Sequence, residues 1–230
     1  MSGLFITGTD TGCGKTLISL GLMRLLQGRG HSVLGMKPVA SGADVTPQGL
    51  RNGDALRLRA QGSLELPYPA INPYVFAPPI APHLAAGQAG ETIDLNLIRA
   101  HCEALAAQAD HVIVEGVGGW RVPLNERQAV SDLALMLGLP VVLVVGLRLG
   151  CINHALLSAE SILAGGAPLA GWVATEVEPG MLARSGNIET LEQWIGAACL
   201  GVVPYLEGPS ADEVARSLEL PDLQGTVGVK

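Results

Sequence analysis

Aromatic side chains and charged side chains are both scarce in this chain of 230 residues. Phe, Trp and Tyr make up 3% of the residues, and charged residues make up 15% against 48% hydrophobic residues. Alanine, leucine, valine and glycine must therefore provide most of the core packing. The formal net charge is −7 and no basic run occurs, which argues against a surface that binds nucleic acid.

Segments typical of export or of membrane insertion are also missing. The longest apolar stretch, residues 139–147, is too short to cross a bilayer and predicts a buried strand. The N-terminus enters a predicted strand almost at once and leaves no room for a signal peptide. The four cysteines lack the paired spacing of zinc sites. We therefore expect a cytoplasmic protein with reduced cysteines, no membrane partner and no nucleic-acid partner.

A glycine-rich segment, GTDTGCGKT at residues 8–16, follows a short apolar run and precedes a helical pattern. A strand, a glycine-rich turn ending in Gly-Lys-Thr and a helix form the layout of a phosphate-binding P-loop. Lys15 would reach the outer phosphates, and the Thr16 hydroxyl would bind Mg²⁺. Five residues separate Gly8 from Gly14, where the consensus has four. The alternative is a glycine-rich turn with a solvated lysine, but the context favours binding of ATP or a close relative.

Strand and helix patterns alternate along the chain. The apolar runs predict strands at residues 4–7, 32–36, 111–115, 140–145, 169–174 and 200–203. Helical spacing predicts helices at 17–26, 54–61, 94–108, 131–138, 153–163 and 188–197, with Asp94 and Ser131 as N-caps. We expect one α/β domain over residues 1–230, with a doubly wound, mostly parallel sheet and helices on both faces.

Residues 63–92 hold many of the prolines and little periodicity, so we expect a long segment with weak regular structure there. A loop of that length in a compact domain is usually a lid or a substrate wall.

Candidate catalytic residues follow predicted strands, where ligands of such sheets gather. Glu115 ends a buried strand and is expected to contact Mg²⁺, although it could instead cap the following turn. Lys37 ends another strand and would stabilise a transferring γ-phosphate. Asp54 is either a further Mg²⁺ ligand or a helix-start acid, and Ser41 either binds substrate or supports its turn. The helix start after residues 146–150 could bind an anion such as a substrate carboxylate.

Five motifs, in order along the chain, together resemble dethiobiotin synthetase. They are GTDTGCGKT at 8–16, MKPVASG at 36–42, RNGDAL at 51–56, VIVEGVGGW at 112–120 and GLRLGCINHA at 146–155. The resemblance implies an ATP- and Mg²⁺-dependent ligase of biotin biosynthesis with a P-loop NTPase-like fold. Such an enzyme forms a carbamate from 7,8-diaminononanoate and CO₂ or bicarbonate and phosphorylates it with ATP. Closure of the ureido ring then gives dethiobiotin, ADP and phosphate.

The same resemblance implies roles for individual residues. Lys37 and Lys15 would be catalytic, and Mg²⁺ would be held by Thr16, Asp54 and Glu115. Contacts with the nucleotide or its metal are implied for Gly12, Cys13, Gly14, Lys15, Thr16, Leu17, Asp54, Glu115, Gly116, Val117, Gly118, Thr175, Glu176, Pro204, Tyr205 and Leu206. Substrate contacts are implied for Thr11, Ser41, Gly150, Cys151 and Asn153. The family is a homodimer with its substrate near the interface, so residues 150–153 would come from the partner subunit.

Two positions depart from the family pattern. Gly12 stands where the family loop commonly has an acidic residue, and Thr175 stands where an asparagine reads adenine, which puts strict ATP preference in doubt. Two other classes share the general loop. Partitioning-type regulatory ATPases often place a lysine where this chain has Asp10, and ligases that amidate corrin side chains usually carry a further glutaminase domain.

Overall fold

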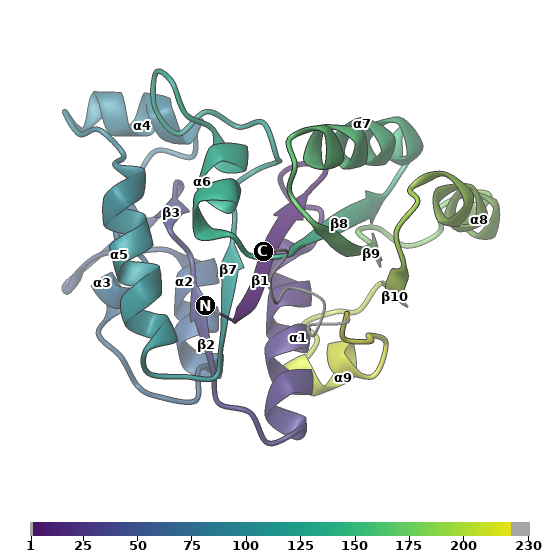
Figure 1. Cartoon of the computed structure of the whole chain (residues 1–230), viewed down its shortest axis with the longest axis horizontal. Coiled ribbons are helices and arrows are strands. Elements are labelled where there is room, and N and C mark those ends of the chain that lie inside the picture. The colour runs from purple at the N-terminus through teal and green to yellow at the C-terminus, as the bar shows by residue number, and fades with distance from the viewer. Residues whose placement is uncertain (1, 222–230) are drawn as a thin grey trace, which may run out of the picture.

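The computed structural model describes residues 2–221 and is built around a six-stranded sheet (Figure 1). The strand order is β10-β9-β8-β1-β7-β2, and every neighbouring pair is parallel. The strands are β1 (Gly3–Gly8), β2 (Val33–Met36), β7 (His111–Glu115), β8 (Val141–Leu147), β9 (Leu169–Glu176) and β10 (Cys199–Val203). The central strands β1 and β8 are buried along their whole length, as continuous apolar runs in a covered parallel sheet should be.

Helices cover both faces of this sheet, and successive side chains of one strand enter different cores. On β1, Phe5 belongs to the core beneath α5 (Leu95–Ala106), α6 (Val130–Leu137), α7 (Cys151–Ala164) and α8 (Arg184–Trp194). Leu4 and Ile6 belong to the opposite core, with side chains of α1 (Lys15–Gly28), α2 (Gly53–Gln61) and α9 (Ala211–Ala215). Figure 1 shows α9 beside α1. The predicted doubly wound α/β architecture is confirmed.

Residues 63–92 hold more regular structure than the sequence predicted. They form α3 (Tyr68–Ile71), β6 (Tyr74–Val75) and α4 (Pro82–Gln88), and β6 pairs in parallel with β3 (Val39–Ala40). Prolines in the first turns of α3 and α4 suit helix starts, because proline lacks only an N–H that has no intrahelical partner there. A hairpin of β4 (Asp44–Thr46) and β5 (Gly49–Arg51) precedes α2.

The helix ends confirm one predicted cap and correct another. The Asp94 carboxylate accepts a hydrogen bond from Asn96 N at 2.8 Å, as an N-cap should. The prediction for Ser131 is wrong, because α6 begins earlier and Ser131 is buried within its first turn. The Asp132 carboxylate instead accepts from Ala129 N at 2.7 Å. The helix predicted at 188–197 is also displaced, since α8 begins at Arg184 and ends at Trp194.

None of the helices within residues 2–221 combines the length and the apolar character that a membrane span requires.

Candidate nucleotide and substrate site

Three neighbouring strands bring the predicted catalytic residues to one edge of the sheet. The P-loop follows β1, Glu115 ends β7 and Lys37 follows β2, and these strands are adjacent in the order β1-β7-β2. A cavity of about 340 Å³ opens between them. The predicted site residues that line it are Thr11, Gly12, Gly14, Lys15, Thr16, Leu17, Lys37, Ser41, Asp54, Glu115, Val117 and Gly118.

The P-loop owes its shape to glycines and to a small buried side chain. Gly12 and Gly14 have φ angles of 78° and 94°, which L side chains rarely adopt. Cys13 is fully buried beneath the loop, where its small side chain fills space. Helix α1 begins at Lys15 with no side-chain cap, so its first N–H groups are available to an anion.

Thr175 packs against this loop and forms a hydrogen bond with its backbone. Its side chain is 2% exposed, and its hydroxyl donates a hydrogen bond to the carbonyl of Cys13. A Cβ atom on Gly14 would lie 3.1 Å from that hydroxyl oxygen, so the two residues are closely packed. The hydroxyl is therefore already used within the protein.

The other residues that the resemblance assigned to the nucleotide lie beside Thr175. Glu176 forms an ion pair with Arg184, and residues 204–206 follow β10, whose Val203 is in register with Thr175 of β9. The carboxyl ends of β9 and β10 therefore bring 175–176 and 204–206 to the same edge of the sheet as the P-loop.

Lys37 is the centre of a buried polar network. Its Nζ lies 2.6 Å from Glu115 Oε1, 3.1 Å from Asp54 Oδ2 and 3.4 Å from the carbonyl of Gly116. Thr16 donates a hydrogen bond of 2.9 Å to the same Glu115 oxygen. Asn52 caps α2 with its side chain and thereby fixes Asp54 in the first turn.

The charges of this network stabilise one another. Burial alone would lower the pKa of Lys37, but the attraction of Glu115 and Asp54 outweighs it, and the pKa is raised above its usual value. Burial would raise the pKa of Asp54, but the nearby Lys37 ammonium holds it below its usual value. Lys37 is therefore an ammonium and Asp54 a carboxylate at neutral pH.

The donor set of this network fits a magnesium ion. Thr16, Asp54 and Glu115 offer hydroxyl and carboxylate oxygens, the ligands that Mg²⁺ prefers. Glu115 Oε2 is buried and has no hydrogen-bond partner among the described residues, so it has a lone pair free for a cation. Within residues 2–221 no group of three or more His, Cys, Asp or Glu side chains could hold a metal by itself. A magnesium ion here would need further oxygens, such as those of a nucleotide.

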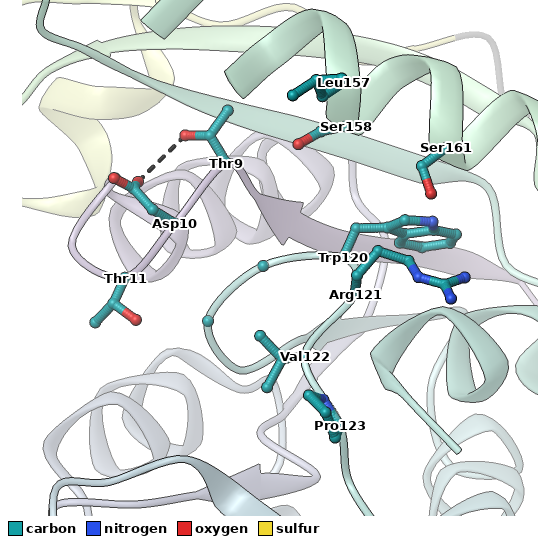
Figure 2. Close-up of a pocket in the computed structure, with 12 residues that line it drawn as sticks. Thr9, Asp10, Thr11, Trp120, Arg121, Val122, Pro123, Leu157, Ser158 and Ser161 are labelled. Atoms are coloured by element: carbon teal, nitrogen blue, oxygen red, sulfur yellow. Dashed lines mark hydrogen bonds between the residues drawn. The ribbon is translucent and has the colours of Figure 1, made fainter. Parts of the chain in front are cut away.

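A second cavity of about 470 Å³ (Figure 2) adjoins the first. The two cavities share Thr11 and Gly118 in their linings. A Cβ atom on Gly119 would lie 3.2 Å from the carbonyl oxygen of Gly8, so glycine lets the segment after β7 pass against the loop after β1. This close approach places Gly119 directly against the start of the P-loop.

Part of the second cavity was missed by sequence reasoning. Residues 9–11 and 118–120 of its wall belong to two of the motifs found in the sequence, but Arg121, Val122, Pro123, Leu157, Ser158 and Ser161 gave no signal. The residues of α7 come from a distant part of the chain, and nothing in their sequence distinguishes them from other helix-face residues.

The start of α7 lies apart from both cavities. Gly150 has a φ of 95° and precedes a helix with no side-chain cap, so free N–H groups are present as predicted. Cys151 is buried, and its Sγ lies 3.8 Å from Asn187 Oδ1, whereas Asn153 is exposed. None of Gly150, Cys151 and Asn153 lines either cavity of its own chain.

Solved structures of low sequence identity share this fold. The MinD-containing cell-division complex of Aquifex aeolicus matches with a TM-score of 0.57 at 16% identity, covering 94% of this chain and 86% of that one. A ParA family ATPase of Chlorobium tepidum matches with a TM-score of 0.56 at 13% identity, covering 95% and 91%. At these identities the likeness concerns the fold alone.

Sequence relatives are far closer. Residues 2–212 match a family model described as an AAA domain, a P-loop family. The chain is 55% identical over 226 residues to the ATP-dependent dethiobiotin synthetase of Pseudomonas aeruginosa, covering 97% of this chain and 98% of the relative. It is 50% identical to the protein of the same name from Chromohalobacter salexigens, covering 94% and 95%. The chain therefore belongs to the ATP-dependent dethiobiotin synthetases and is an ATP-dependent cyclo-ligase.

Proposed function

We propose that this enzyme converts 7,8-diaminononanoate, CO₂ and ATP into dethiobiotin, ADP and phosphate, and that it works in the cytoplasm on biotin biosynthesis. The observation that supports this most strongly is the pair of adjoining cavities. One is lined by the P-loop and the Lys37 network, and the other can take a substrate chain. A reaction that phosphorylates one end of an elongated substrate needs both spaces and a shared wall between them.

The first chemical step forms a carbamate. One amine of the substrate attacks CO₂, a C–N bond forms, and the nitrogen loses a proton. We place the reacting end of the substrate at the shared wall, beside the Thr11 hydroxyl and Gly118. Ser41 lines the first cavity there and would donate a hydrogen bond to the carbamate oxygens.

The second step transfers the γ-phosphoryl group. A carbamate oxygen attacks the γ-phosphorus, the bond to the β-phosphate oxygen breaks, and ADP leaves with the electron pair. The P-loop amides and Lys15 would hold the phosphates, and the Lys37 ammonium would stabilise negative charge on the transferring group. In the final step the second amine attacks the carbamoyl carbon, and phosphate leaves as the ring closes.

Magnesium would be held by Thr16, Asp54 and Glu115 together with nucleotide oxygens, and when bound it would neutralise charge on the phosphates. Lys37 occupies the middle of this group of ligands. Its ammonium lies between two carboxylates, Glu115 and Asp54, which leaves a negative charge that a magnesium ion would offset.

We also propose a homodimer in which the start of α7 serves the partner's site. Leu149, Leu157 and Leu163 are more than half exposed on the loop before α7 and on α7 itself, so this segment offers apolar side chains that a partner subunit could cover. Leu157 also lines the second cavity, so a partner subunit packed on this face would lie at the cavity mouth. The free N–H groups near Gly150 and the Asn153 amide of the partner could then bind the substrate.

A partitioning-type regulatory ATPase is the alternative function, and the fold alone would allow it. Position 10, where those proteins often carry a lysine, is an aspartate whose carboxylate lies 3.6 Å from Arg148 Nη1. Position 10 therefore carries an acidic residue in place of the lysine, and this residue forms an ion pair with Arg148.

Product formation tests the proposal directly. Purified protein with 7,8-diaminononanoate, bicarbonate, Mg²⁺ and ATP should release phosphate and form dethiobiotin, detected by mass spectrometry. The matched control omits the diamine. Folded protein that releases no more phosphate with the diamine than without it would exclude the synthetase function.

A further inference from the structure

The first cavity is lined by a charged residue to which the proposed mechanism gives no role. Arg57 lies on α2 and lines this cavity together with Asp54 of the same helix. The two residues are three positions apart, and helix residues at this spacing lie on the same face. Both side chains therefore face the P-loop across the cavity, and Arg57 is the more exposed of the two.

The guanidinium of Arg57 has no partner within residues 2–221, where it forms neither an ion pair nor a hydrogen bond. The Asp54 carboxylate is paired with Lys37 at 3.1 Å instead. Arg59, on the same helix, differs from Arg57 because it donates to the Leu66 carbonyl and pairs with Glu65. All the N–H donors of the Arg57 guanidinium are therefore available to a ligand in the cavity.

Arg57 also determines the sign of the charge on the cavity wall. The charged residues of the wall are three cations and two carboxylates, namely Lys15, Lys37, Arg57, Asp54 and Glu115. Without Arg57, two ammonium groups would balance two carboxylates and the wall would be neutral. With Arg57 the wall is positive, which suits a triphosphate because this group keeps negative charge after it has bound one Mg²⁺ ion.

The strand order places Arg57 at one end of the expected nucleotide position. The base is expected beside residues 204–206, which follow β10, the outermost strand on one side of the sheet. Helix α2 packs on β2, the outermost strand on the other side, and the P-loop follows β1 between them. A triphosphate that runs along the P-loop from the base toward Lys37 therefore brings its γ-phosphate to the end of the cavity where Arg57 lies.

We propose that Arg57 is a further catalytic residue that binds the γ-phosphate of ATP. This inference rests on the proposed function, because it takes the first cavity as the place of the triphosphate. The guanidinium fork can donate two parallel hydrogen bonds to phosphate oxygens. The γ-phosphate is present in ATP and absent from ADP, so Arg57 strengthens binding of the substrate nucleotide and not of the product nucleotide. ADP then leaves more readily after the phosphoryl group has been transferred.

Arg29 provides a matched control for this assignment. It is an exposed arginine at the end of α1, it does not line the first cavity, and its side chain forms no ion pair within the described part of the chain. Arg57→Gln and Arg29→Gln remove the same charge from the protein. Only Arg57→Gln removes it from the cavity, so an effect of net charge is separated from an effect of contact.

The experiment compares two nucleotides by calorimetry, with Mg²⁺ present and the diamine absent. One is ADP, and the other is the ATP analogue in which an imido group replaces the oxygen between the β- and γ-phosphorus. Arg57→Gln should weaken binding of the imido analogue about tenfold and change the affinity for ADP by less than about twofold. Arg57→Lys should retain part of the affinity for the analogue, and Arg29→Gln should behave as the parent protein. An equal loss for both nucleotides, or no loss for either, would overturn the assignment.

Nucleotide binding also separates this inference from the proposed function. If the parent protein binds the imido analogue but forms no dethiobiotin, the proposed function fails. A tenfold loss in Arg57→Gln that is confined to the analogue would then still support the contact. Equal affinity of the parent and Arg57→Gln for the analogue would refute the contact even in a fully active enzyme. Absence of nucleotide binding to the parent protein would refute both.

Discussion

The Nζ of Lys37 lies 2.6 Å from Oε1 of Glu115, and both side chains are almost completely buried. A buried ion pair of this kind links catalysis to folding, because neither charge is tolerated without the other.

Replacement of Lys37 should therefore affect both turnover and stability. We expect Lys37→Ala to reduce turnover by about a hundredfold or more, with a much smaller change in the affinity for ATP. Without ligands, the lone carboxylate should lower the free energy of unfolding by about 3 kcal/mol, measured in urea. The double variant Lys37→Ala/Glu115→Gln should regain most of this stability. Unchanged turnover in Lys37→Ala would remove Lys37 from the mechanism.

Replacement of Gly12 should destabilise the protein because of the backbone conformation at this position and not because of contacts with neighbouring side chains. Its φ angle is 78°, and a Cβ atom there would meet nothing within 4 Å. Gly12→Ala should lower the free energy of unfolding by about 1 kcal/mol through backbone strain alone. Gly53→Ala is the control, because Gly53 also has open space but an ordinary φ at the start of α2. Equal stabilities of the two variants would contradict the strain argument.

Replacement of Thr175 should weaken binding of the nucleotide's phosphates more than it changes recognition of the base. Thr175→Val removes the hydrogen bond to the Cys13 carbonyl and should loosen the P-loop. We expect the KM values for ATP and CTP to rise by similar factors, because both nucleotides place their phosphates on this loop. A rise for ATP alone would show that the hydroxyl reads the base and would contradict the supporting role.

The proposed dimer predicts complementation between two defective variants. Lys37→Ala and Asn153→Asp should each be poorly active alone, the second because it places a negative charge near the substrate carboxylate. Mixed subunits should give heterodimers in which one site has both native residues. With random exchange, about a quarter of the parent activity should return. A mixture no more active than the mean of its parents, with dimers present by sedimentation, would contradict a shared site.

His111 should make stability depend on pH near the amino end of the sheet. Burial and the neighbouring His31 lower its pKa, although Asp110 opposes them. The unfolded chain therefore binds a proton at a higher pH than the folded chain does. The free energy of unfolding should decrease as the pH falls below about 6.5, the ordinary histidine value.

Denaturant unfolding at pH 7.5 and 5.5 measures this effect. His111→Gln should remove part of the decrease, and His154→Gln, at an exposed position on α7, should leave it intact. The same pH dependence in all three proteins would exclude His111 as its source.

Sequence patterns predicted the strands and most helices because each is a long apolar run or a clear helical repeat. These patterns failed where a single local contact determines the residue at which an element begins. Ser131 has the composition of an N-cap, yet the Asp132 carboxylate binds Ala129 N and the helix begins before Ser131. The short elements between Tyr68 and Gln88 depend on tertiary contacts, such as the Asn72 amide that donates to the carbonyls of Lys37 and Tyr74.

In the site, too, some residues could be predicted from the sequence and others could not. The P-loop, Lys37 and Glu115 can be placed from the sequence because each follows a predicted strand at one sheet edge. The wall formed by Arg121 and α7 could not be predicted, because residues about 40 positions apart meet only through the order of the strands. The hydrogen bond from the Thr175 hydroxyl to the Cys13 carbonyl could not be predicted from the sequence either.

The wall common to both cavities bears on the lifetime of the activated carbamate. Such mixed anhydrides hydrolyse readily, so an enzyme that moved one between distant compartments would lose some of it to water. In the proposed reaction both amines belong to neighbouring carbons of one substrate molecule, so the attacking amine would stay beside the activated carbamate. A reacting end held at the wall of Thr11 and Gly118 would let phosphorylation and ring closure occur without release of the intermediate.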